Sequence, residues 1–506
     1  MKKLTNAIYL MHRWLGMVIC LPVALWFATG MVMMYVGFPE LSERERYAGL
    51  PNLEPETISH SPAMLIATVE ANARIEALRL TSTGHRPLYL LKLGDGAWRG
   101  QYADSGEVVR DFSAESAVLA ARHFHHTANP GRVTTPAHAQ RLDMDQWTVS
   151  SALNDYRPLH RISMNDQAGT QLYVSARTGQ VVRDTTNKER IWNWLGANLH
   201  WIYPFHLRKD VSLWRDVVIT LALTGLITIL SGAIIGFIQL RIRRRRERQS
   251  FSPYRGIAKY HHLLGLLGLI FLTTFMFSGL MSMGPWDLFK SRSNFSDQLE
   301  RYQAGENSSR SALVYASVSD LRHLLSQEEY RGTKEIVWRW IDGESYITLH
   351  QSPSHQSYRL AVGDKETLVD KIQRGLGRLI PGSNVSNQQQ LWDYDLYYYS
   401  HHDRLRPLPV LRTRHSDPES TWFHIDTTTG QLVERLTAKT RLERWLFNGL
   451  HSLDFPLLLN HRPAWDLVLL TLCTLGLFFS ATSIILSWRY LGKSLNTLSD
   501  SSQNQG

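Results

Sequence analysis

The residues with the clearest chemical potential in this sequence are histidines at the ends of long apolar segments. His12 stands at the beginning of one such segment, and the neighbours His261 and His262 open another. His200 and His451 each come shortly before one of the two remaining segments. Ionisable side chains in membrane segments tend to mark functional pathways, although a single interfacial histidine is also an ordinary amphipathic anchor. Recurrence at matching positions is what favours a shared chemical role.

The histidines do recur, because the sequence repeats itself. The stretch Arg190–Pro204, with His200 in it, occurs again near the end of the chain with His451 in the corresponding place. At a second constant offset His12 corresponds to His261, and the leucines and glycines around it correspond as well. A repeat of this length indicates a duplicated structural unit. The sequence therefore predicts two tandem units, each made of an apolar span, an exterior domain and a second apolar span.

Four segments are long and apolar enough to cross a bilayer, which takes roughly 20 residues. They are Trp14–Tyr35, Leu213–Leu240, Leu263–Met283 and Ala464–Trp488. The first is too long for a signal peptide and lacks a small-residue cleavage site, so it is interpreted as a retained anchor. Lysines and arginines gather before the first span, between the second and third, and after the fourth. By the positive-inside rule both termini are expected in the cytoplasm, and the large segments between spans outside it.

Composition excludes several other chemistries. The two cysteines, Cys20 and Cys473, both lie inside apolar segments, which excludes a disulfide-stapled exterior, covalent haem attachment, an iron–sulfur cluster and a thiolate zinc site. No glycine-rich motif for NAD, FAD or ATP is present. The net charge of +10 is largely explained by the basic residues that flank the spans, so no nucleic-acid partner is expected.

Two facing imidazoles without a cysteine ligand suit a non-covalent b-type haem. The predicted topology brings one histidine from each repeat to each side of the membrane. His12 would meet His261 or His262 on the cytoplasmic side, and His200 would meet His451 on the other. Imidazole is a good iron ligand, and helix bundles commonly hold cofactors between facing helices.

Other residues are weaker candidates. Gly16 and Gly265 follow His12 and His261 by one helical turn, where a missing side chain would leave room for a flat macrocycle or serve ordinary helix contact. Two histidine clusters in the exterior segments could bind a metal ion or simply be solvated. They are His123, His125 and His126 in the first segment, and His401 and His402 in the second.

The exterior segments show an α+β pattern. Pro62–Ala73 and Ala114–His126 have helical periodicity, and short apolar runs such as Trp98–Tyr102 and Leu172–Ser175 fit strands. The predicted organisation is a first span (1–37), an exterior α+β domain (38–188), a pre-span helix with the second span (189–240), an arginine-rich loop (241–259), a third span (260–285), a second exterior α+β domain (286–439), a pre-span helix with the fourth span (440–490) and a tail (491–506).

The sequence resembles the PepSY-associated transmembrane-helix family of bacterial inner-membrane proteins, whose members include iron-regulated proteins and siderophore-iron reductases. The resemblance rests on Met11–Gly16, Tyr260–Gly265, Arg157–Ile162, Tyr173–Val182 and Trp192–Trp201. It implies a four-helix membrane bundle with two PepSY-like α+β domains in the periplasm. For the reductase members it also implies two haems b stacked across the membrane. Carried over by position, their ligands would be His12 with His261 or His262, and His200 with His451.

Two functions of different classes are compatible with these features. The first is an electron conduit, a haem-dependent ferric-chelate reductase. A quinol or a separate cytoplasmic reductase would donate electrons, and a ferric siderophore or other Fe(III) chelate would accept them outside. The alternative is a non-enzymatic envelope sensor or protease-modulating protein, in which the histidines are interfacial anchors. Either protein would act in the lipid bilayer, and either is compatible with a homodimer.

Overall fold

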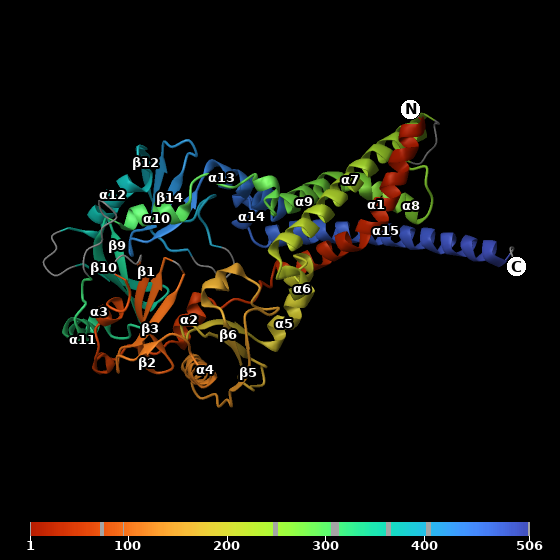
Figure 1. Ribbon diagram of the computed structural model, residues 1–506. Coiled ribbons are helices and arrows are strands. Elements are labelled where there is room, and N and C mark those ends of the chain that lie inside the picture. The colour runs from red at the N-terminus through yellow and green to blue at the C-terminus, as the bar shows by residue number, and fades with distance from the viewer. Residues whose placement is uncertain are drawn as a thin grey trace. The chain divides into compact units, whose positions relative to one another are not determined.

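The computed structural model describes residues 2–70, 75–94, 96–245, 251–304, 313–360, 366–400 and 406–503. The chain forms two units, and each is assembled from stretches that are far apart in the sequence (Figure 1). The helical unit comprises Met1–Phe38, Ile191–Lys290 and Lys439–Gly506, and the β-rich unit comprises Pro39–Arg190 and Ser291–Ala438. Both units therefore draw on both halves of the chain.

Three long helices frame the helical unit: α1 (Lys2–Met33), α7 (Val211–Arg245) and α15 (Ala464–Gln503). Helix α1 packs against both of the others. Helix α8 (Ile257–Leu267) packs against α15, and α9 (Leu269–Met281) packs against α7. Within the described residues, the three long helices are long and apolar enough to cross a membrane, and α8 with α9 makes a fourth span if the bent pair counts as one.

The third apolar segment is broken. The sequence predicts one continuous span over Leu263–Met283, but α8 and α9 meet at Gly268 with a bend of 69°. A Cβ atom at Gly268 would lie 2.8 Å from Phe271 Cε1 and 3.0 Å from the Leu264 carbonyl oxygen, so the bend depends on the missing side chain. Glycine is frequent in membrane helices, which is why its presence alone does not predict a break.

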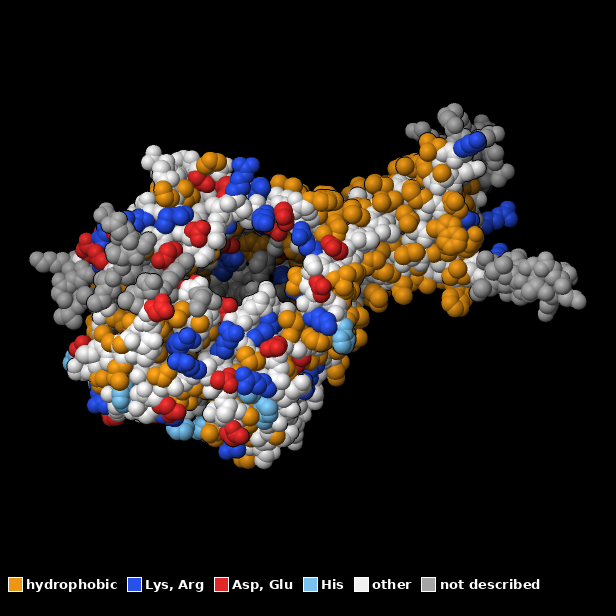
Figure 2. Space-filling model, in the orientation of Figure 1, with side chains coloured by type: hydrophobic (Ala, Val, Ile, Leu, Met, Phe, Trp, Pro, Cys, Tyr) orange, Lys and Arg blue, Asp and Glu red, His pale blue; other side chains and the backbone are white. Residues whose placement is uncertain are grey.

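Large apolar side chains face outward from the helical unit. Val18 is 63 % exposed, Leu21 58 % and Phe478 62 %. Figure 2 shows hydrophobic side chains spread over the long helices, with few charged side chains among them. Exposed apolar surface of this extent marks an interaction surface, and helices of this length fit the hydrocarbon core of a bilayer. The protein is therefore a membrane protein.

Three antiparallel sheets build the β-rich unit. The largest has seven strands in the order β11-β10-β9-β1-β2-β3-β4. Its strands are β1 (Ile75–Thr83), β2 (Arg86–Leu93), β3 (Trp98–Tyr102), β4 (Val108–Val109), β9 (Glu335–Ile341), β10 (Glu344–Ser352) and β11 (His355–Arg359). At its centre β1 pairs with β9, with the buried residues Leu78 and Trp338 opposite each other.

The pairing of β1 with β9 joins the two exterior segments. The sequence predicts separate α+β domains over 38–188 and 286–439, whereas both segments contribute strands to one sheet and fall into one compact unit. An unpaired edge strand exposes a row of backbone hydrogen-bonding groups, and this pairing satisfies the edges of β1 and β9 together.

The other two sheets have four strands each, in sequential order. One contains β5 (Ala137–Leu142), β6 (Leu159–Ser163), β7 (Gln171–Ser175) and β8 (Val181–Thr185), and the other β12 (Val385–Leu391), β13 (Val410–His415), β14 (Trp422–Asp426) and β15 (Leu432–Leu436). Helix α4 (Ala114–Ala128) packs on the first sheet, burying Ala117 and Ala121 in a cluster with apolar residues of β6 and β7. Helix α12 (Leu368–Leu379) shares an apolar cluster with β13 and β14 of the second.

Shorter helices connect these elements. In the β-rich unit they are α2 (Glu43–Gly49), η1 (Pro55–Thr57), α3 (Pro62–Ile66), η2 (Ser151–Tyr156), α10 (Phe295–Gln303), α11 (Val318–Leu325) and η6 (Glu328–Tyr330). In and around the helical unit they are α5 (Asn187–Asn193), η3 (Trp194–Asn198), α6 (Phe205–Arg208), η4 (Pro285–Asp287), α13 (Ala438–Arg444), η7 (Trp445–Gly449) and α14 (Pro456–Leu459).

The predicted helix over Ala114–His126 is confirmed as α4. The predicted helix over Pro62–Ala73 is too long, because α3 ends at Ile66 and a turn follows. Its second half contains Thr68 and Val69, whose branched side chains lose rotamer freedom in a helix.

A buried ion pair ties the two exterior segments together. The guanidinium of Arg46 donates to both carboxylate oxygens of Glu335, at 3.0 and 3.1 Å. Arg79 Nη1 lies 3.8 Å from the same carboxylate, and Glu335 is only 3 % exposed. Burial by itself would raise the pKa of Glu335, but the two guanidinium groups outweigh it and lower the pKa from 4.5 to about 2. The ionised form of Glu335 therefore stabilises the β-rich unit.

We expect the stability of the β-rich unit to fall in acid. Because the pKa of Glu335 is lowered on folding, its ionised carboxylate contributes its full stability above pH 4.5. This contribution is lost as the pH falls toward about 2. Glu335→Gln should flatten this dependence and lower the free energy of unfolding at pH 7 by about 3 kcal/mol, since a buried guanidinium loses its partner. Thermal unfolding followed by circular dichroism between pH 7 and about 2 measures both effects. Glu76→Gln, which removes a partly exposed partner of Lys92 at 3.0 Å, is the control and should change little. An unchanged acid slope in Glu335→Gln would contradict the prediction.

Candidate functional site

His200 and His451 occupy equivalent positions in the helical unit. Each follows a single π-helical turn, η3 before His200 and η7 before His451. π-Helical turns are rare and are frequently found at functional sites. Trp214 Nε1 donates to the carbonyl oxygen of Trp201, and Trp465 Nε1 to that of Ser452, both at 2.8 Å. Because these carbonyls belong to the residues directly after the two histidines, the tryptophans hold both segments in place.

The imidazole rings of His200 and His451 face each other. Their centroids are 6.1 Å apart, and the ring planes make an angle of 70°. Thr29 Oγ1 lies 3.1 Å from His200 Nδ1, and Ser278 Oγ lies 3.0 Å from His451 Nδ1. Each ring is thus anchored through Nδ1 to a hydroxyl group on α1 or α9.

His12 and His261 form a second pair of the same kind. Their centroids are 6.3 Å apart, with an angle of 47° between the planes. His12 Nδ1 lies 3.0 Å from the Thr228 carbonyl oxygen on α7. His261 Nδ1 lies 3.2 Å from Thr482 Oγ1 and 3.3 Å from Ser483 Oγ on α15. These anchoring groups differ from those of His200 and His451, so each pair is held by hydroxyl and carbonyl groups of its own.

The anchors fix the tautomer of all four rings. A carbonyl oxygen can only accept, so His12 carries its proton on Nδ1. Thr29 and Ser278 already donate their hydroxyl hydrogens to backbone carbonyls, at 2.6 and 3.1 Å, and so does Thr482, at 2.6 Å. Their oxygens therefore accept from the histidines. With the proton on Nδ1, Nε2 is left as an unprotonated lone pair in each ring. This is the arrangement by which proteins orient a histidine ligand.

The ring spacing of both pairs is compatible with one metal ion held between two imidazoles. A ring centroid lies about 1.2 Å from its atoms and a metal–imidazole bond is about 2.0–2.1 Å long, so the two centroids should be about 6.4 Å apart. The observed values are 6.1 and 6.3 Å. No group of three or more His, Cys, Asp or Glu residues within the described chain could hold an ion. An ion between these rings would therefore take its other ligands from outside these four side-chain types, for example from water or a cofactor.

His262 does not take part in either pair. Its Nδ1 lies 2.9 Å from Ser252 Oγ, and its Nε2 lies 3.1 Å from the Gly236 carbonyl oxygen. Both nitrogens are engaged and the ring is buried. Of the two neighbours left open by the sequence, His261 is the one that faces His12, and His262 ties the segment before α8 to α7.

Comparison with known protein families identifies the family of this chain. The family model described as the PepSY-associated TM region matches residues 9–316, which is more than half of the chain. The chain belongs to this family. The matched part includes His12, His200 and His261, and His451 lies beyond it. No curated protein matches the chain.

Glycines in this PepSY-associated protein lie against the histidine rings. A Cβ atom at Gly30 would be 3.4 Å from His200 Cε1, and one at Gly279 would be 3.6 Å from His451 Cε1. At Gly232 a Cβ atom would be only 2.6 Å from His12 Cε1. Small residues thus bring the backbones of α1, α7 and α9 close to three of the four rings.

The two glycines singled out in the sequence have different surroundings. A Cβ atom at Gly16 would meet only Thr228 Cγ2, at 3.8 Å. At Gly265 it would lie 3.1 Å from Phe479 Cε2, and the Phe479 ring stacks on His261 with centroids 4.9 Å apart. Gly265 therefore makes room for a phenylalanine that packs on His261.

The exterior histidine clusters do not assemble as single metal sites. His125 Nε2 lies 3.6 Å from Asp166, while His123 faces His85 and no contact joins it to His125. His126 is exposed at the end of α4. His401 and His402 lie outside the described residues.

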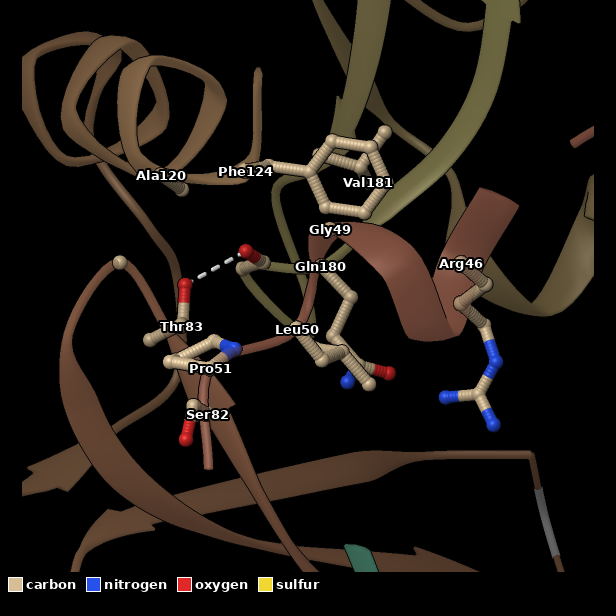
Figure 3. Close-up of a pocket in the computed structure, with 12 residues that line it drawn as sticks. Arg46, Gly49, Leu50, Pro51, Ser82, Thr83, Ala120, Phe124, Gln180 and Val181 are labelled. Atoms are coloured by element: carbon tan, nitrogen blue, oxygen red, sulfur yellow. Dashed lines mark hydrogen bonds between the residues drawn. The ribbon is translucent and has the colours of Figure 1, made fainter. Parts of the chain in front are cut away.

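The β-rich unit contains a pocket at the turn between β7 and β8 (Figure 3). The Gly179 carbonyl accepts a 2.6 Å hydrogen bond from Thr83 Oγ1, which joins this turn to the end of β1. The pocket is lined by Arg46, Gly49, Leu50, Pro51, Ser82, Thr83, Gly84, Ala120, Phe124, Gly179, Gln180 and Val181. Because Arg46 is already paired with Glu335, the pocket holds no free charge among these residues.

Sequence reasoning missed the residues that anchor the rings. They are Thr29, Thr228, Ser231, Ser278, Thr482 and Ser483. A signal was present, since the offset that relates His12 to His261 also relates Thr29 to Ser278, and both carry a hydroxyl group. In the sequence, Trp214 and Trp465 are typical of interfacial residues. Their hydrogen bonds to the carbonyl oxygens of Trp201 and Ser452 depend on the fold.

Proposed function

We propose that this membrane protein is a di-haem b electron-transfer protein built from two tandem repeats. His200 with His451 would hold one haem iron, and His12 with His261 the other. The observation that supports this most strongly is that all four rings are anchored through Nδ1 and lie in two pairs, with centroids 6.3 and 6.1 Å apart. Haem b supplies reversible one-electron transfer when it is bound.

The chain's own residues would orient and isolate the two sites. Thr29 and Ser278 accept the Nδ1 protons of His200 and His451, which holds the rings in the ligating tautomer and raises their basicity. The Thr228 carbonyl does the same for His12. The surrounding helices supply apolar side chains such as Phe275 and Phe479, whose rings lie 5.9 Å from His451 and 4.9 Å from His261. These side chains pack against the rings and would lower their contact with water.

The proposal places the two sites near opposite faces of a bacterial inner membrane. Gly30, beside His200, comes 18 residues after His12 on α1, a rise of about 27 Å along a helix and close to the bilayer core of about 30 Å. The basic residues put both termini in the cytoplasm and the β-rich unit in the periplasm, with α8 and α9 together as the fourth span. A quinol or a separate cytoplasmic reductase would be the donor. The acceptor would be a ferric siderophore or another Fe(III) chelate, so that the protein acts as a reductase.

The deciding experiment is the absorption spectrum of the purified full-length chain, produced with haem supplied. We expect b-type Soret and α bands and about two haems per chain by pyridine haemochrome assay. His261→Ala should remove about one haem. Both ring nitrogens of His262 are already hydrogen-bonded, so a folded His262→Gln chain should keep both haems. A preparation without haem bands would overturn the proposal and favour the sensor or protease-modulating function.

Loss of one anchoring hydroxyl should weaken haem binding selectively. Thr29→Val keeps the shape of the side chain but removes the hydroxyl group that accepts from His200 Nδ1. We expect haem affinity at this site to fall about 10- to 100-fold. The midpoint potential of that haem should rise, since the ligand becomes less electron-donating. Haem retention during dilution and a redox titration measure these effects. Thr471→Val is the control, because its hydroxyl bonds only the Leu467 carbonyl of its own helix, at 2.6 Å. Equal behaviour of the two variants would contradict the role of Thr29.

A further inference from the structure

One pair of imidazoles in the β-rich unit is not used by the proposed electron transfer. His85 lies in the turn between β1 and β2, and His123 lies on α4. His85 Nδ1 is 3.3 Å from His123 Nε2, and the ring centroids are 4.8 Å apart. Among the described residues neither ring has a carboxylate partner.

The corresponding place in the second half of the β-rich unit is built with opposite charges. The turn between β9 and β10 carries Asp342, which faces α12. Arg374 Nε donates to Asp342 at 3.0 Å, and Arg378 pairs with the same carboxylate. At the β1–β2 turn this ion pair is replaced by two imidazoles. Two neutral imidazoles with converging nitrogens can share one hydrogen bond, or they can bind one cation between them.

The geometry of the pair fits two ligands of one ion. With metal–nitrogen bonds of about 2.0–2.1 Å, two nitrogens of a tetrahedral site are about 3.3 Å apart, which is the observed separation. Burial and the neighbouring His85 and Arg122 lower the pKa of His123, which favours the neutral imidazole that binds metals. His85 is exposed and His123 half-buried, so an ion can reach both.

We propose that His85 and His123 form a two-imidazole site for a borderline divalent transition-metal ion such as Zn²⁺ or Cu²⁺, with water as the remaining ligands. The site adjoins the pocket of the β-rich unit, because Gly84 and Phe124, the chain neighbours of the two histidines, line that pocket (Figure 3). Gly84 has a φ of +61°, and a Cβ atom there would lie 3.6 Å from His123 Cδ2. Glycine therefore lets the turn bring His85 close to α4. The proposal does not depend on the haem sites.

Titration of the full-length protein with Zn²⁺ by isothermal calorimetry tests this site. We expect one saturable site in the wild-type chain and at least about a tenfold weaker dissociation constant in His85→Ala and in His123→Ala. His126→Ala, on the same helix but outside the pair, should bind like the wild type. His85 is in an exposed turn, so His85→Ala should fold, and circular dichroism of each sample checks this independently.

Two outcomes would overturn the proposal. One is that the wild type binds no more Zn²⁺ than the His85→Ala and His123→Ala chains. The other is that His126→Ala weakens binding as much as they do. In the first case the 3.3 Å contact is an ordinary hydrogen bond between two neutral imidazoles. Neither outcome bears on the haems, which are counted separately by their absorption.

Discussion

Changing His200 to alanine should lower the haem content from about two per chain to about one. The His200 ring is one of two rings 6.1 Å apart, and under the proposed function its partner His451 alone would not hold the haem. The His12–His261 pair has its own anchors on α7 and α15, so the second haem should stay. Pyridine haemochrome analysis gives the haem content, and a redox titration should show one midpoint in place of two. Electron transfer to an external Fe(III) chelate should fall to the background rate.

The matched control is His461→Ala. This histidine belongs to the same end of the helical unit, but it is exposed and bonds only the Leu457 carbonyl, at 2.8 Å. It should leave the haem content unchanged. Retention of about two haems in His200→Ala would show that the His200–His451 pair does not bind haem. Loss of both haems with an unchanged helical circular dichroism signal would show that the two sites are not independent.

The pairing of histidines was predictable because the sequence repeats at a constant offset. One offset placed His12 with His261 and a second placed His200 with His451, without any knowledge of the fold, and the structure brings these residues together. It could not separate His261 from His262. Neighbouring residues on a helix point about 100° apart. The direction of His262 depends on contacts with Ser252 and Gly236, which lie outside its own helix.

The local elements of the β-rich unit were also predictable, but the way they assemble was not. The helix α4 and strands such as β3 follow from hydrophobic periodicity and turn residues. The pairing of β1 with β9 joins residues more than 250 positions apart, as in Leu78 opposite Trp338. No periodic pattern encodes which two edges meet, because both strands would be equally stable with another partner of the same burial pattern.

Side-chain anchors were harder to predict than the ligands for a related reason. Serine and threonine are common in membrane helices, where they bond the carbonyl one turn earlier, as Thr273 does at 2.7 Å. Thr29 and Ser278 make the same kind of bond and accept from a histidine as well. The second bond depends on how α1 and α9 pack against the segments that carry His200 and His451.

Changing Gly232 to alanine should empty the His12–His261 site and leave the other haem in place. A Cβ atom at position 232 would lie 2.6 Å from His12 Cε1 and 3.1 Å from His12 Nδ1. A free ring could turn away at little cost, but a ring bound to iron and to the Thr228 carbonyl cannot. Alanine is the better helix former, so α7 itself should not be weakened. We expect about one haem per chain by pyridine haemochrome assay, with the absorption spectrum of the remaining His200–His451 haem unchanged.

Gly16→Ala is the matched control for this substitution. Gly16 lies one helical turn after His12 on α1, and a Cβ atom there would meet only Thr228 Cγ2 at an ordinary 3.8 Å. The same added methyl group should therefore keep both haems. If Gly232→Ala kept both haems with unchanged spectra, the His12 ring would not be fixed against α7 by a bound iron. If Gly16→Ala lost a haem instead, the macrocycle would lie beside Gly16 on α1. It would then not lie where the contact between Gly232 and His12 indicates.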